Sequence, residues 1–273
     1  SAELPRRERA HLISDGLESE ADGEAIAAAL PDTQAGERLT YAYAYTPMFA
    51  ANLTSQELLG LANDPRVVRI HEDRASEPLL PRSTAMMEMD VLHTANYRGA
   101  GRAVAILDNG FRVEHPMYAS RVQRGWCFST AGAGQPSLCT TGRQPAGIAT
   151  VGACSGLSGC VHGTHVASTA AGGWRYNGPL LSDRLSSVAP YSVLWLVQVF
   201  HRTSDNRTQS YTSDQQAALE ALYAARNSNL NNPLAAINMS LGGGGTTAAC
   251  TTHALRPIIQ LLRNAGVATI IAA

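Results

Sequence analysis

The chain of 273 residues carries 21 lysines and arginines against 22 aspartates and glutamates, so its formal net charge is −1. This balance gives no electrostatic reason to expect nucleic acid or an anionic membrane as a partner. The length allows one large or two modest domains with a sizeable core, and the sequence contains no apolar run long enough to cross a membrane.

The N-terminal part of the sequence predicts a small α+β unit. Alternating apolar residues over 39–46 predict a strand, and residues 66–73 predict a second one. Between them, Thr54 and Glu57 have the spacing of a capping box and therefore predict the start of a helix. An earlier helix is predicted over 20–30.

The next segment, RASEPLLPRST over 74–84, contains two prolines and has no periodicity. It predicts an exposed linker, the kind of segment in which proteolysis concentrates.

Beyond this linker, apolar runs alternate with helical patterns. Buried strands are predicted over 102–108, 193–200, 235–241 and 267–273, and helices within 162–173, 213–227 and 252–266. This alternation is typical of an α/β fold with an open, mostly parallel sheet and helices on both faces, in which sites gather at the carboxyl ends of strands. Ser213 and Gln216 predict a capping box for one helix. Because the sequence stops inside the last predicted strand, we expect it to be part of a longer polypeptide.

Four of the five cysteines, Cys127, Cys139, Cys154 and Cys160, lie in a short stretch rich in Gly, Ser and Thr. There is no C-x-x-C pair, which disfavours a zinc knuckle. We expect the disulfides Cys127–Cys139 and Cys154–Cys160, and hence an oxidising compartment; the alternative is buried, reduced thiols. Cys250 is left without a partner in this sequence.

Two titratable residues stand where catalytic groups are often found. Asp108 ends the first buried strand just before a glycine turn, and His162 begins a helix of small residues. A histidine oriented by a carboxylate can act as a general base, although Asp108 could instead stabilise its turn. A metal site formed by His162 and His165 is disfavoured, because the zincin pattern needs i, i+4 spacing and a glutamate. His165 is expected to pack or to bond a backbone carbonyl.

The segment NMSLGGGG over 238–245 ends a predicted strand in four glycines. Such a strand allows a close approach of another backbone, so a peptide could pair with Ser240, Leu241 and Gly242 as an added strand. The alternative is an ordinary glycine-rich loop. The Lys-Ser/Thr of a phosphate-binding loop is missing.

Together these motifs resemble one family. VAILDNGFRVEHP, HGTHVAS and INMSLGG occur in the order in which subtilisin-like serine proteases, the subtilases, carry their aspartate, histidine and substrate-binding blocks. The leading unit resembles the inhibitory and chaperoning propeptide of such enzymes, with a ferredoxin-like α+β fold. The resemblance implies a propeptide over 1–77, a linker and start of the mature enzyme over 78–95, and the N-terminal part of a catalytic domain over 96–273.

The resemblance also implies roles for single residues. Asp108 would be the triad acid and His162 the general base. The backbone of Ser240, Leu241 and Gly242 would bind substrate, opposite an edge segment over 208–213 that matches the family more loosely.

Some family features are missing or changed. Neither the oxyanion-hole asparagine block nor the Gly-Thr-Ser-Met-Ala block of the nucleophile occurs in the sequence. Asn109 replaces the usual Ser or Thr. No cofactor is implied for catalysis; a structural calcium ion is a family feature, but Met117 stands where many secreted members have an aspartate, so the sequence does not support that site.

The leading hypothesis is therefore a serine endopeptidase zymogen, of which this chain supplies Asp and His only. Its expected partners are a polypeptide substrate and its own propeptide in the cleft, with no nucleic acid and no membrane. A secreted or periplasmic location is expected, although no signal peptide is visible. The alternatives are a truncated, non-catalytic protein whose prosegment inhibits or chaperones proteases, and a metal-dependent hydrolase using Asp108, His162 and His165.

Overall fold

The structure is a computed structural model. It describes residues 8–13, 39–43, 45–46, 48–65, 67–73, 75–78, 88–131, 136–139, 147–152, 161–173, 187–242 and 252–272.

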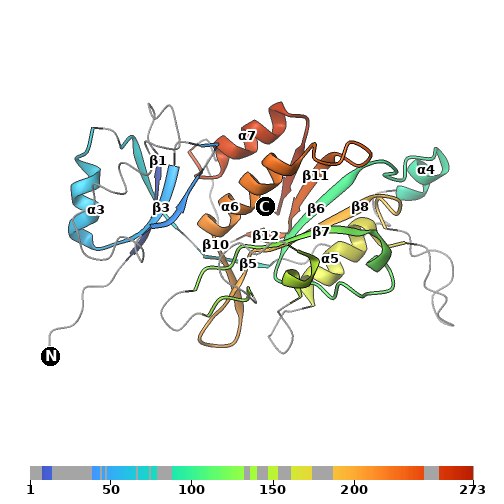
Figure 1. Cartoon of the computed structure of the whole chain (residues 1–273), viewed down its shortest axis with the longest axis horizontal. Coiled ribbons are helices and arrows are strands. Elements are labelled where there is room, and N and C mark those ends of the chain that lie inside the picture. Colours follow the sequence, from blue (N-terminus) through green and yellow to red (C-terminus); the bar gives the residue numbers. More distant parts are fainter. Residues whose placement is uncertain are drawn as a thin grey trace.

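A five-stranded parallel sheet forms the centre of the larger part of the molecule (Figure 1). In sheet order its strands are β13 (Ala268–Ile271), β11 (Leu234–Met239), β6 (Ala103–Asp108), β8 (Val193–Gln198) and β7 (Val122–Cys127). The four strands predicted from apolar runs are all present, and the α/β prediction with a parallel sheet is confirmed. Strand β7 was not predicted, because its sequence VQRGWC mixes polar and apolar residues at the edge of the sheet.

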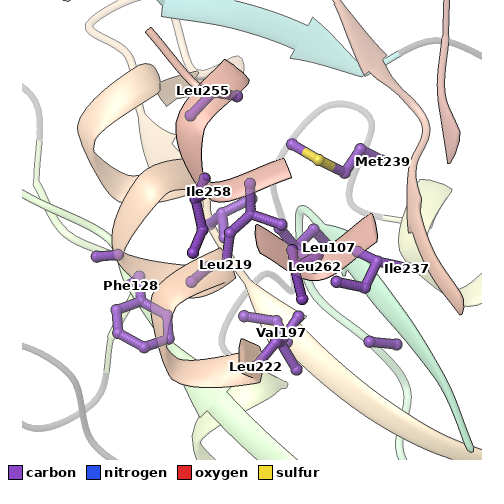
Figure 2. Close-up of a cluster of buried hydrophobic side chains, with 14 of the residues drawn as sticks. Leu107, Phe128, Val197, Leu219, Leu222, Ile237, Met239, Leu255, Ile258 and Leu262 are labelled. Carbon is purple, nitrogen blue, oxygen red and sulfur yellow. The ribbon is translucent and has the colours of Figure 1, made fainter. Parts of the chain in front are cut away.

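Helices cover both faces of this sheet. Along β6, Leu107 packs in the cluster with α6 (Thr212–Ala225) and α7 (Arg256–Asn264), whereas its neighbour Ile106 packs in the cluster with α5 (His162–Ala171). Successive strand residues point to opposite faces, so both faces are buried. Figure 2 shows the first cluster. Its side chains include Leu107, Val197, Leu219, Leu222, Ile237, Ile258 and Leu262.

Among its described residues, this part also contains three shorter helical segments: α4 (Met89–Thr94), η2 (Ala119–Arg121) and η3 (Ile148–Val151). In the part of the chain that the structure describes, no helix combines the length and apolarity that a membrane span requires.

A second, antiparallel sheet lies near the N-terminus and consists of β2 (Leu39–Ala42), β3 (Met48–Leu53), β1 (Glu8–Ile13) and β4 (Arg69–Glu72), in that order. Helix α3 (Ser55–Ala62) joins β3 to β4 and packs on β3 through Leu61. We call these elements, with the residues between them up to Asp73, the N-terminal unit.

Three sequence expectations for the N-terminal unit can be compared with the structure. The capping box at α3 is confirmed: the Thr54 N–H donates to Glu57 Oε2 at 2.7 Å, and the Glu57 N–H donates to Thr54 Oγ1 at 3.4 Å. The strand expected over 39–46 is shorter, because β2 ends at Ala42 and the chain turns before β3. The helix expected over 20–30 lies outside the described residues.

The expectation of an exposed linker over 74–84 is wrong for its first residues. Ala75–Pro78 forms strand β5, which lies between β12 (Leu241–Gly242) and β10 (Thr208–Tyr211) in an antiparallel sheet completed by β9 (His201–Arg202). Strands far along the chain supply its pairing, which a periodicity argument about the segment alone does not detect.

The capping box expected at Ser213 and Gln216 is also wrong. Helix α6 begins at Thr212, so Ser213 lies within its first turn. The Ser213 N–H donates to Asp73 Oδ1 at 2.9 Å, and its hydroxyl donates to Asp73 Oδ2. The acceptor for this helix start therefore comes from the N-terminal unit.

Candidate active site

Asp108 and His162 form a buried pair at the carboxyl edge of the parallel sheet. Asp108 is the last residue of β6 and His162 the first residue of α5, and their exposed fractions are 0% and 4%. His162 Nδ1 lies 2.8 Å from Asp108 Oδ1 and 2.9 Å from Asp108 Oδ2. The structure therefore brings together the two residues that the sequence singled out, although they are 54 positions apart.

Glycine residues allow the start of α5 to approach the turn after β6. A Cβ atom on Gly163 would lie 2.4 Å from the carbonyl oxygen of Gly110 and 3.0 Å from Asp108 Cβ. Gly110 has a φ of +122°, a conformation that side chains disfavour. The sequence pattern of glycines beside Asp108 and His162 thus has a steric cause.

Two opposing effects act on the pKa of Asp108. Burial raises the pKa of Asp108, whereas hydrogen bonds from His162 and from the Asn109 N–H oppose this by stabilising the carboxylate. When the carboxylate accepts a hydrogen bond from Nδ1–H, the neutral imidazole keeps Nε2 as its acceptor nitrogen. A histidine in that tautomer can take a proton from a nucleophile.

Asn109 and Gln198 lie beside this pair. Neither residue was assigned a role in the site from the sequence. The Asn109 N–H donates to Asp108 Oδ1 at 2.7 Å, and Asn109 Oδ1 accepts the Gly163 N–H at 3.2 Å. Gln198 Nε2 donates to the Asn109 carbonyl at 2.8 Å. A polar residue that ends an otherwise apolar strand, as Gln198 ends β8, is the sequence signal that could have found it.

The predicted substrate strand lies at the same edge of the sheet. Because Met239 pairs with Leu107 in parallel strands, Ser240 and Asp108 both follow at the carboxyl ends of neighbouring strands. Asn238 Nδ2 donates to Ser240 Oγ at 2.8 Å.

An extended segment of this same chain pairs with that strand. Leu241 and Gly242 of β12 pair with Pro78 and Glu77 of β5. On its other side β5 pairs with β10, where Ser210 opposes Ser76 and Tyr211 opposes Ala75. The two edges therefore hold a peptide segment between them by antiparallel pairing, in the manner of β-strand addition.

The other predictions have mixed outcomes. The disulfide Cys127–Cys139 is confirmed, with a Cα–Cα distance of 5.6 Å; Cys154, Cys160 and Cys250 lie outside the described residues. His165 is exposed on α5, so the expectation that it packs is wrong, whereas its bond to a backbone carbonyl stays a prediction.

Two observations bear on metal binding. Within the described ranges, no group of three or more His, Cys, Asp or Glu residues is arranged to hold a metal ion. Met117 packs against the apolar cluster under α5. That Met117 does not support a calcium site at this position stays a prediction from the sequence.

Comparisons with known proteins agree with this geometry. Residues 99–273 match the Subtilase family, peptidase S8. Subtilisin E of Bacillus subtilis strain 168 is 26% identical over 223 residues, which cover 80% of this chain and 48% of that protein. The extracellular serine proteinase of Thermus sp. strain Rt41A is 28% identical over 234 residues, covering 82% of this chain and 46% of that protein. The chain thus spans about half the length of these curated relatives.

A solved structure supports the fold. The crystal structure of the epidermin leader peptide processing serine protease of Staphylococcus aureus superposes with a TM-score of 0.59 at 15% identity, covering 98% of this chain and 60% of that one.

Proposed function

The chain belongs to the subtilase family, and from that premise we propose that it is part of a serine endopeptidase that hydrolyses peptide bonds through an Asp-His-Ser triad. The observation that carries this proposal is the buried contact of His162 Nδ1 with Asp108, at 2.8 and 2.9 Å. Asp108 orients the imidazole and stabilises its charged form, while His162 takes the proton of the nucleophile and returns it to the leaving amine. The serine comes from polypeptide outside these 273 residues.

In this proposal residues 1–77 are the propeptide of a zymogen, and the mature enzyme starts within 78–95. The strand order β2-β3-β1-β4, with antiparallel pairing throughout, supports the proposal of a ferredoxin-like propeptide. Several polar contacts join this unit to α6. Among them, Asp73 accepts bonds from Ser213, and Glu220 accepts the Tyr45 N–H at 2.9 Å.

The same zymogen proposal gives β5 a role. Its position between β10 and β12 is where a substrate would add a strand, with Ser240, Leu241 and Gly242 on one side. A tail held there blocks access of other peptides until it is removed.

The remaining features of the proposal are its partners and location. The substrate is a polypeptide, as in other subtilases, and the triad needs no cofactor. A secreted or periplasmic location is supported by the Cys127–Cys139 disulfide and by the relative named as extracellular.

Peptide hydrolysis by the full-length gene product tests the catalytic roles. His162→Ala and Asp108→Asn are each expected to lower kcat by about 10⁴-fold or more, since the residues of a triad act as a unit. His165→Ala, on the exposed side of the same helix, serves as the matched control and should leave kcat unchanged. A His162→Ala variant that keeps its activity within tenfold of wild type would exclude the proposed base.

A second candidate function, a protease inhibitor or chaperone without its own catalysis, is favoured by the paired position of β5. It is tested by adding the purified 273-residue chain to an active subtilisin. Inhibition, combined with a full-length product that hydrolyses no peptide, would establish this candidate instead of the first. Hydrolysis lost on His162→Ala would reject it.

A further inference from the structure

Asn109 is fully buried and makes polar contacts with four elements of the site. Its backbone N–H donates to Asp108 Oδ1 and its carbonyl accepts from Gln198 on β8. Its side-chain oxygen accepts the Gly163 N–H of α5 at 3.2 Å, and its side-chain amide lies 3.5 Å from Thr208 Oγ1 on β10.

The contact with Gly163 replaces a local helix cap. The first N–H groups of an α-helix have no acceptor within the helix, and in α5 the N-cap residue Val161 provides no side-chain bond. Gly163 follows His162 directly, so the side chain that accepts its N–H also restrains the backbone that carries the imidazole. The helix with the histidine is thus fastened to the turn with the aspartate by Asn109.

The contact with Thr208 reaches a different part of the site. Thr208 begins β10, and two residues later this strand pairs with the extended segment β5. The side-chain amide of Asn109 therefore makes both contacts: its oxygen accepts a bond from α5, and its nitrogen faces the edge strand β10. Neither Ser nor Thr has a side chain with an acceptor and an NH₂ donor on separate atoms.

We propose that Asn109 is a positioning residue that caps α5 from the turn after β6 and couples the orientation of His162 to the edge strand β10. The catalytic consequence of this inference depends on the proposed function, whereas the restraint on His162 does not. A residue that only filled space would be replaced without loss by an apolar side chain of equal size.

The direct test uses two near-isosteric variants of the 273-residue chain, Asn109→Leu and Asn109→Asp, and the Nδ1–H proton resonance of His162 in NMR spectra. Leu keeps the volume but leaves the Gly163 N–H without its acceptor, so the low-field resonance should broaden or disappear. Asp keeps the acceptor oxygen and should retain it. Asn229→Leu, a half-buried residue in the loop before β11, is the matched control and should leave the resonance unchanged.

The kinetic test uses the full-length gene product. Asn109→Leu should lower kcat by about 100-fold, because small displacements of a catalytic group have effects of that size. Thr208→Val should chiefly raise KM, and Thr208→Ser, which retains the hydroxyl, is its control. In a protein that already carries Asn109→Leu, Thr208→Val should have no further effect.

The outcomes separate the two proposals. An unchanged His162 resonance in Asn109→Leu, or a Thr208→Val effect that adds in full to that of Asn109→Leu, would overturn the positioning role. If the wild-type product hydrolyses no peptide, the proposed function fails, while the NMR comparison still decides whether Asn109 restrains His162. If Asn109→Leu does not fold, the comparison of Thr208→Val with Thr208→Ser decides the coupling, and an unchanged KM would overturn it.

Discussion

Helix α3 obtains its first hydrogen bonds from its own sequence, whereas α5 and α6 obtain theirs from distant parts of the chain. Thr54 and Glu57 cap α3 reciprocally over three residues. Gly163 in α5 bonds Asn109 at a separation of 54 positions, and Ser213 in α6 bonds Asp73 at a separation of 140. The start of α3 in the N-terminal unit therefore depends on local sequence. The starts of the two helices beside the candidate site depend on tertiary contacts, with Asn109 of the site for α5 and with Asp73 of the N-terminal unit for α6.

The largest test of this difference exchanges a glycine in each kind of helix. Gly163→Ala should destabilise the protein by about 3 kcal/mol, because its Cβ would lie 2.4 Å from the Gly110 carbonyl oxygen. Gly60→Ala in α3 meets nothing within 4 Å and should stabilise by about 0.5–1 kcal/mol, because it lies in a helix interior. Denaturant unfolding measures both values. A Gly163→Ala protein as stable as wild type would show that the close approach is not required.

A second test breaks the disulfide Cys127–Cys139, which lies in the loop that contacts α6. Thr130, three residues after Cys127, donates from its backbone to Asp214 Oδ2 at 3.1 Å and from its hydroxyl to Oδ1 at 2.5 Å. The disulfide Cys127–Cys139 holds this loop, so its reduction should lower the unfolding free energy by about 2–3 kcal/mol. A Cys127→Ser/Cys139→Ser variant should show the same loss and no response to reductant. Equal stability with and without reductant in the wild type would contradict the prediction.

A third test compares the two caps directly. Asp73→Ala should cost about 1–2 kcal/mol and also loosen the N-terminal unit from α6, since the carboxylate bonds Ser213 across the interface. Thr54→Ala should cost about 1 kcal/mol and leave the interface intact. Amide hydrogen exchange at Ser213 distinguishes the two, since only Asp73→Ala should increase it. Equal exchange in both variants would mean that α6 does not depend on the distant cap.

The same distinction explains what the sequence could predict. Strands β6, β8 and β11 were predictable because strands buried on both faces have continuous apolar sequences. Asp108 and His162 were each recognisable as candidates from their positions beside glycines, and the resemblance to subtilases implied their pairing. Short stretches of sequence are enough to indicate these features.

What the sequence could not predict depends on partners far along the chain. Strand β5 contains a proline and lacks alternation, and its pairing comes from β10 and β12. The roles of Asp73 and Asn109 as helix caps depend on tertiary contacts, so a search for local capping boxes assigned the start of α6 to Ser213 and Gln216 instead. Tertiary contacts override local propensity where parts of the chain meet.

The smallest expected effect concerns pH and the contact of Glu220 with the N-terminal unit. Its carboxylate accepts the Tyr45 N–H at 2.9 Å and the Thr46 hydroxyl at 2.8 Å, and also receives a bond from Gln216. Burial raises the pKa of Glu220 above its ordinary value of 4.5, despite the opposing effect of these bonds. Folding therefore takes up protons at Glu220.

The sign of the pH effect follows from that uptake. The contribution of Glu220 to the free energy of folding is complete below its ordinary pKa of 4.5 and is lost as the pH rises through the raised pKa. The protection of the Tyr45 amide, corrected for intrinsic exchange, should thus decrease over that window in the wild type and stay level in Glu220→Gln. Glu114→Gln, an exposed carboxylate beside Arg112, should behave like the wild type. A Glu220→Gln protein with the wild-type dependence would assign the effect to another group and leave Glu220 as a contact whose strength does not change with pH.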